Sequence, residues 1–217
     1  MPNPAPHHAP WTPAERKILA KLSRPIEIQG FLNTVAYSAD KFARSPRSVM
    51  RDRKANCYDG ALFAAAALRQ LGYPPLLLDM RPEPGRDDDH VIAIFRRQGG
   101  WGSIAKSNFV GLRYREPIHR SLRELVISYF NDYFNDLGTY AEKTLRSYSV
   151  PVNLAKLDRL EWETRDDNLD EVAGYLDRAR HIPIVTRKQA AELELVDERT
   201  LKAGLFGSVK AGLFKVG

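Results

Sequence analysis

The feature that most constrains the fold is the run Ala61 to Leu71, which places apolar or small residues on nearly every side of a helix. A helix without a polar face is buried, and its many alanines let neighbouring elements approach closely. Asn56 is positioned to cap this helix, and Asp59 lies three residues later, at the positive end of the helix dipole. Gly72 predicts its C-terminal end. The rest of the chain must therefore pack around a central helix.

The same stretch holds the single cysteine of the chain, Cys57. One cysteine forms no intramolecular disulfide, so a reducing compartment is expected. The first ten residues lack the basic and apolar pattern of a signal peptide, and no stretch approaches the ~18 apolar residues of a membrane span. The sequence therefore predicts a soluble, cytoplasmic protein with no membrane partner.

The chain has 217 residues, of which 43% are hydrophobic and 28% charged, in the range of ordinary globular proteins. The formal net charge is +6, but the basic residues are scattered and accompany no nucleic-acid-binding signature. Nucleic acid is therefore not expected as a partner. His7 and His8 are adjacent in a flexible stretch without further ligands. Accordingly, neither a metal nor another cofactor is predicted.

The remaining elements follow from capping, breaking and periodicity signals. Thr12-Pro13-Ala14-Glu15 is a capping box with proline at the first helical position. It predicts a helix over 13–22, and a weaker helical pattern follows over 28–39. Residues 47–54 form a short segment that leads the chain to Cys57. Residues 76–80 predict a buried strand, and 90–96 with 101–108 predict a hairpin around a Gly-containing turn.

The sequence after residue 119 predicts further helices. Leu122, Leu125, Val126, Tyr129, Phe130, Tyr133 and Phe134 lie at helical spacing, which is typical of a core face rather than a cofactor-stacking surface. Another amphipathic helix is expected over 166–179. The pentapeptide Lys-Ala-Gly-Leu-Phe occurs at 202–206 and again at 210–214. An apolar, glycine-bearing, basic segment can dock on its own domain or on a partner, and the sequence leaves both open.

A thiol becomes a nucleophile when a helix N-terminus and a nearby imidazolium lower its pKa. Cys57 has the first feature by its predicted position. Among the five histidines, His90 opens a strand of the predicted hairpin, whereas His119 and His181 lie beside helix-end signals and are typical of surface or capping residues. We therefore interpret Cys57 and His90 as a nucleophile and base.

The imidazole also needs an acceptor that fixes its tautomer. If the hairpin turn is centred on Gln98 and Gly99, facing residues have numbers that sum to about 197. Ser107 and Asn108 then lie opposite the start of the first strand. Asn108 is the firmer acceptor, and Ser107 is the alternative. The aspartates at 87–89 are poorer candidates, because neighbouring side chains on a strand point to opposite faces.

Three segments together resemble the core of the transglutaminase-like superfamily. They are Asn56-Cys57-Tyr58-Asp59-Gly60, Leu68-Arg69-Gln70-Leu71-Gly72-Tyr73-Pro74 and Asp89-His90-Val91, over about residues 45–115. That family usually has an aspartate a few residues after a tryptophan on the second hairpin strand. Here Trp101 is followed by Ala105-Lys106-Ser107-Asn108, with no acid. An asparagine can orient the ring instead, as in papain-like cysteine proteases, so the catalytic set is Cys57, His90 and Asn108.

The resemblance implies an α+β fold in which a papain-like core packs the cysteine helix on a small antiparallel sheet. We expect a disordered, Pro-rich segment at 1–10, a core over 11–118 and a mostly helical extension over 119–217. The implied activity is thioester formation from a peptide-like amide, with a peptide, a protein or a small amide as substrate. Hydrolysis and acyl transfer both remain open. A catalytically inactive binding module of the same fold is the alternative.

Overall fold

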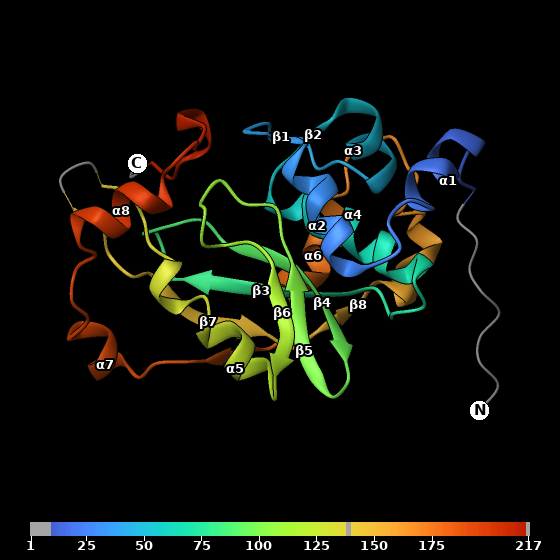
Figure 1. The fold of residues 1–217 in the computed structure, drawn as a ribbon. Helices are drawn as coiled ribbons and strands as arrows, with labels where there is room; N and C mark the ends of the chain where they lie inside the picture. The colour runs from blue at the N-terminus through green and yellow to red at the C-terminus, as the bar shows by residue number, and fades with distance from the viewer. Residues whose placement is uncertain (1–9, 138–139, 216–217) are drawn as a thin grey trace.

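The computed structural model describes residues 10–137 and 140–215 and has an α+β fold built on a seven-stranded sheet whose strand pairs are all antiparallel (Figure 1). The sheet runs in the order β6 (Arg115–His119), β5 (Gly100–Ile104), β4 (His90–Arg97), β3 (Leu76–Pro82), β7 (Leu145–Ser149) and β9 (His181–Pro183). A short strand, β8 (Val152–Asn153), also pairs with β3. Apart from this sheet, β1 (Ala36–Tyr37) and β2 (Lys54–Ala55) form a parallel pair.

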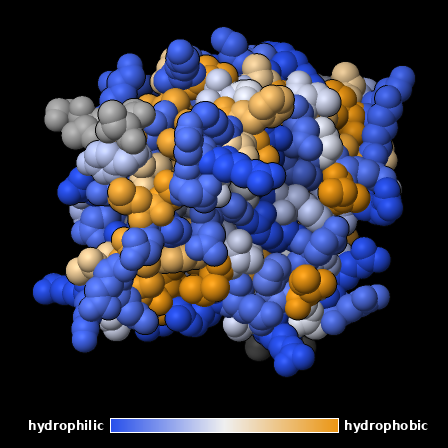
Figure 2. All heavy atoms as spheres, turned by 60° about the vertical axis from the view of Figure 1, so that its left-hand side comes forward, coloured by the Kyte–Doolittle hydropathy of each residue, from blue (hydrophilic) through white to orange (hydrophobic). Residues whose placement is uncertain are grey.

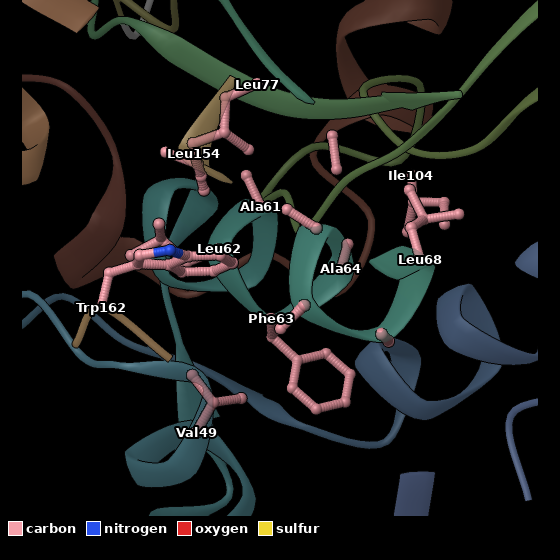
Figure 3. Packing of buried hydrophobic residues seen from close by; sticks show 14 of the residues in the cluster. Val49, Ala61, Leu62, Phe63, Ala64, Leu68, Leu77, Ile104, Leu154 and Trp162 are labelled. Carbon is pink, nitrogen blue, oxygen red and sulfur yellow. The ribbon is translucent and has the colours of Figure 1, made fainter. Parts of the chain in front are cut away.

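Helix α4 (Cys57–Gln70) is the central helix that the sequence predicted. Asn56 and Asp59 cap it reciprocally, each side chain accepting from the other residue's backbone N–H. Every residue from 59 to 68 is buried. The helix packs on β4, and α2 (Pro25–Asn33) and α3 (Pro46–Asp52) pack on its other sides. Figure 3 shows its small and apolar side chains interleaved with those of its neighbours. The prediction of a buried, capped helix is confirmed.

The hairpin of β4 and β5 has the predicted register. Ala93 faces Ile104 and Phe95 faces Gly102, pairs whose numbers each sum to 197. The turn residues Gln98 and Gly99 both have positive φ, 50° and 84°, as a tight hairpin turn requires. However, β5 ends at Ile104. The residues expected to continue the second strand toward 108 therefore leave the sheet, and the register does not extend to them.

The second face of the sheet is covered by α5 (Leu122–Ile127) and the single turn η1 (Phe130–Asp132). The long helix expected from the aromatic stripe is therefore broken near Ser128, whose hydroxyl donates to the Leu125 carbonyl. The aromatic residues are nevertheless core, because Tyr129 and Tyr133 are fully buried. Their hydroxyls are satisfied, with Tyr133 donating to the carbonyls of Met80 and Asp88.

The expected division between a core over 11–118 and a helical extension over 119–217 is wrong. Residues after 119 supply β7, β8 and β9 to the central sheet. The physical reason is that β3 is buried and has two edges, and only one is paired by the hairpin. Strand β7 and strand β8 satisfy the other edge. The expectation of disorder over 1–10 concerns residues that, except Pro10, lie outside the described part of the chain.

The other helices lie around this framework: α1 (Pro13–Leu19), η2 (Leu154–Leu160), α6 (Asp170–Asp177), α7 (Arg187–Ala191), α8 (Glu198–Gly204) and η3 (Lys210–Gly212). Figure 2 shows the side of the molecule on which α7 and α8 lie, with apolar patches interrupted by hydrophilic side chains. Among the helices of the described residues, none combines the length and apolar character needed to cross a bilayer.

Candidate active site

Cys57 is the first residue of α4, so its sulfur lies at the positive end of the helix dipole. Its backbone N–H belongs to the first turn, whose N–H groups have no acceptor within the helix. The residue is half-buried, and its thiol donates to the backbone carbonyl of Asp89 at 3.6 Å between Sγ and oxygen. The chain thus brings the cysteine helix and the residue just before β4 into direct contact.

His90 is the first residue of β4 and is 5% exposed. Its Nε2 lies 3.0 Å from the backbone carbonyl oxygen of Leu112. A carbonyl oxygen only accepts, so Nε2 carries the hydrogen and Nδ1 is the basic nitrogen. The ring makes edge contacts with Tyr129 and Tyr133, with centroids 6.5 and 6.4 Å apart. These contacts and the Leu112 carbonyl hold the imidazole in one orientation.

Cys57 and His90 reach the site from different sides of the sheet. Side chains alternate along β4, so His90 shares its face with Ile92 and Ile94, whereas α4 packs on the opposite face. The hydrogen bonds of both residues within the described chain go to backbone carbonyls rather than to each other. The two side chains nevertheless line one cavity, at the point where the N-terminus of α4 meets the end of the sheet.

Asn108 does not have the predicted role of orienting His90. Its Nδ2 donates to the Val209 carbonyl at 2.9 Å, and its Oδ1 accepts from the Val209 N–H at 2.8 Å. Both ends of the amide are therefore engaged by residue 209. The alternative acceptor, Ser107, accepts from the Phe109 N–H. The acceptor for His90 is instead a backbone carbonyl, that of Leu112, which side-chain patterns in a sequence do not reveal.

The cavity shared by Cys57 and His90 has a volume of about 280 Å³. Its walls come from the loop after β1, the first turn of α4, the 87–90 segment, the 107–112 loop and residues 211–214. Four of its lining residues are aspartates, Asp40, Asp87, Asp88 and Asp89, of which Asp40 is paired with Arg44 and Asp89 lies 3.7 Å from Arg81. In a chain with a formal net charge of +6, this is an acidic recess. A ligand with positive charge or several hydrogen-bond donors would complement it.

Burial dominates the electrostatics of the two proposed catalytic groups. It raises the pKa of the Cys57 thiol to about 12, against the effect of backbone hydrogen bonds from Val91 and Tyr58. Burial likewise lowers the pKa of His90 to about 4, against the effect of the Leu112 carbonyl. In this conformation the site therefore holds a neutral thiol and a neutral imidazole at pH 7. Admission of water would reverse the main cause of both shifts.

Burial is also the largest influence on the acidic residues of the 87–89 segment. It raises the pKa of Asp87 to about 6, where a hydrogen bond from Thr144 opposes it. It raises the pKa of Asp89 to about 6 as well, with the charge of Asp79 as the next cause. Tyr133 fixes this segment by donating to the Asp88 carbonyl at 2.7 Å. The segment that presents the Asp89 carbonyl to Cys57 is thus anchored to the core.

The other two histidines of the described residues differ from the surface or capping residues that we expected. His119 is 8% exposed in β6, with Nδ1 3.1 Å from the Trp101 carbonyl. His181, in β9, lies with Nε2 3.0 Å from Oδ2 of Asp79. Both histidines belong to strands of the central sheet, which the sequence predicted only in part. Neither is among the residues that line the cavity of Cys57.

Two features of the site were missed at the level of sequence. Tyr37 lines the same cavity as Cys57, and its pKa is raised by burial first and by the charge of the Cys57 sulfur next. Residues 211–214 form a further wall. The repeated pentapeptide drew attention to that segment, but its docking site depends on Asn108, 101 positions away from Val209.

The chain matches no model of a known protein family and no curated protein. Within residues 10–137 and 140–215, no cluster of three or more His, Cys, Asp or Glu side chains is arranged to hold a metal ion. The chemistry of the site must therefore be inferred from Cys57, His90 and the groups around them.

Proposed function

We propose that the protein is a transglutaminase-like cysteine enzyme that forms a thioester from a peptide-like amide. The observation that carries this proposal is that the cysteine at the start of a buried helix and the histidine at the start of a strand line one cavity. The helix-on-antiparallel-sheet arrangement supports a papain-like core. The fixed tautomer of His90 supports the base, because its hydrogen-free Nδ1 can accept a proton.

In the proposed reaction, the Cys57 thiol leaves the Asp89 carbonyl and gives its proton to Nδ1 of His90. Sγ attacks the carbonyl carbon of the amide and forms an S–C bond. The C–N bond then breaks, and the leaving amine takes the proton from the imidazolium. Water or a second amine attacks the thioester, gives its proton to His90, and expels Sγ, which recovers that proton. The Cys57 backbone N–H at the helix start is positioned to stabilise the oxyanion.

The substrate chemistry follows from the cavity. A volume of about 280 Å³ is suited to a short stretch of peptide rather than to a large cofactor, and the four aspartates favour a cationic group near the reacting amide. A peptide or protein with basic residues beside the scissile or transferred bond meets both conditions. Hydrolysis and acyl transfer share every step up to the thioester. They differ only in whether water or an amine then attacks it.

The test uses an activated ester, 4-nitrophenyl acetate, as a small acyl donor. Cys57 should displace 4-nitrophenolate and become acetylated, and intact-mass and peptide mapping should place the acetyl group on Cys57. The acetyl group should then be lost to water or to added amine. Cys57→Ser should remove the labelling. His90→Gln keeps a donor to the Leu112 carbonyl but removes the base, and should slow both steps by about 100-fold or more.

The rival function is a binding module that keeps this fold without catalysis. One observation favours it, namely that the hydrogen bonds of Cys57 and His90 go to separate backbone carbonyls. For such a module, Cys57 should react with the ester no faster than an ordinary thiol of the same accessibility, and His90→Gln should leave that rate unchanged. That pair of results would refute the enzymatic proposal.

A further inference from the structure

Residues 208–214, which we term the covering segment, lie against the cavity of the proposed catalytic residues. Ala211, Gly212, Leu213 and Phe214 line the same cavity as Cys57 and His90. The segment includes the second copy of the repeated pentapeptide. Leu213 and Phe214 are half-buried there, whereas the neighbouring Lys210 is exposed. A peptide stretch of this chain therefore already occupies one wall of the site.

Asn108 holds the covering segment by its backbone. The side-chain amide both donates to the carbonyl and accepts from the N–H of Val209, at 2.9 and 2.8 Å. This is the pairing that a neighbouring β-strand would offer, and it recognises a backbone rather than a particular side chain. Val209 itself is 40% exposed. Any polypeptide that passes the same point can make the same two bonds.

Gly212 passes close to two side chains of the cavity wall. A Cβ added there would lie 2.5 Å from the Tyr37 ring and 3.3 Å from Nδ2 of Asn108. The Gly212 N–H also donates to the Val209 carbonyl at 2.9 Å, which closes a tight turn. The requirement for glycine is thus one of space between two side chains. Tyr37 and Asn108 together limit the size of the residue that can pass between them.

The first copy of the pentapeptide packs at a different place: the Gly204 carbonyl accepts from the Val110 N–H at 2.9 Å, and a Cβ on Gly204 would lie 2.5 Å from the Phe134 ring. Residues 202–206 belong largely to α8, and Phe206 at their end is 82% exposed. The second copy differs in having Val209 before it, bound to Asn108. Lys210 and Lys215 flank the cavity-lining residues 211–214 in the sequence, and both are exposed. Backbone pairing with the Asn108 amide and a glycine between Tyr37 and Asn108 therefore coincide only at the second copy.

We propose that the cleft binds a basic peptide segment whose glycine passes between Tyr37 and Asn108. The covering segment occupies the position of that substrate, and it excludes the peptide until it is displaced. This inference deepens the proposed function and rests on it, since it names the substrate class of the same site. Displacement also admits water to Cys57, and so relieves the burial that keeps its thiol neutral.

The first test displaces the segment in the full chain. Gly212→Ala places a methyl group against Tyr37, and Val209→Pro removes the N–H from which the Asn108 side chain accepts. Both variants should raise the rate at which iodoacetamide alkylates Cys57 by about tenfold or more. Gly30→Ala is the matched control, because a Cβ there meets nothing within 4 Å. An unchanged rate in both cleft variants, with folding intact by circular dichroism, would overturn the proposal.

The second test supplies the segment in trans. A synthetic peptide of residues 208–215 should slow alkylation of the Gly212→Ala protein, and the same peptide with alanine in place of its glycine should not. Equal protection by both peptides, or none by either, would contradict the inference. Alkylation of Cys57 needs only an accessible thiol and not the base. Protection of Cys57 by the peptide can therefore be measured in the His90→Gln protein, which separates peptide binding from catalysis. Protection without ester turnover would refute the enzymatic function alone, and turnover without protection would refute the substrate class alone.

Discussion

Replacing Asn108 by alanine distinguishes its observed role, holding the covering segment, from its predicted role, orienting His90. The substitution removes two hydrogen bonds to the Val209 backbone, each worth about 1 kcal/mol net or less because residue 209 is partly exposed to water. A loss of about 1 to 2 kcal/mol corresponds to a 5- to 30-fold shift toward the displaced covering segment. If alkylation of Cys57 requires displacement, its rate should rise by about the same factor.

The assay is alkylation of native protein by iodoacetamide at pH 7, followed by intact mass. Ser107→Ala is the matched control, because Ser107 lies on the same loop but accepts from the Phe109 N–H rather than from the covering segment. It should leave the rate of Cys57 unchanged. Unfolding curves of both variants would exclude labelling through global unfolding.

The direction in which the alkylation rate of Cys57 changes distinguishes the two roles of Asn108. An Asn108 that oriented His90 would support the base, so its loss should lower the reactivity of Cys57. An Asn108 that holds the covering segment keeps the thiol closed, so its loss should raise that reactivity. A decrease, or an unchanged rate in a folded protein, would refute the reasoning.

Two further predictions concern stability. Burial lowers the pKa of His90 from 6.5 to about 4, so its stabilising contribution is complete above pH 6.5 and is lost as pH falls toward 4. The free energy of unfolding of the wild type should therefore fall relative to His90→Gln by up to about 3 kcal/mol over this range in urea titrations, and parallel curves would contradict it. Asp59→Ala should cost about 2 to 4 kcal/mol, because the fully buried carboxylate accepts from the N–H groups of Arg44 and Asn56. A loss below about 1 kcal/mol in urea would show that these groups find other partners.

The local parts of the fold were predictable from the sequence because they depend on residues close together in the chain. The capping pair around Cys57 and the glycine-bearing hairpin turn each specify geometry within a few residues. The hairpin register followed from the turn alone. The placement of the cysteine helix and the His90 strand on one cavity agrees with the hypothesis that they act together.

The remaining parts depend on contacts between distant residues. Strand β7 pairs with β3 across more than 60 positions, and its short polar sequence has little strand periodicity. The acceptor for His90 is a backbone carbonyl, which every residue type possesses, so no residue pattern marks Leu112. The sequence marked Asn108 as a candidate site residue, but its partner Val209 is 101 positions away. Chemistry carried by a single backbone group is therefore the least predictable feature of this site.

The pKa of Cys57 in the Asn108→Ala protein, measured from the pH dependence of its alkylation with and without His90→Gln, tests the central claim most directly. A nucleophile at a helix N-terminus, paired with a histidine and open to water, should titrate below the ordinary value of about 8.5, and His90→Gln should raise that pKa. A pKa at or above 8.5 that is the same in both proteins would contradict the account and leave Cys57 an ordinary buried thiol.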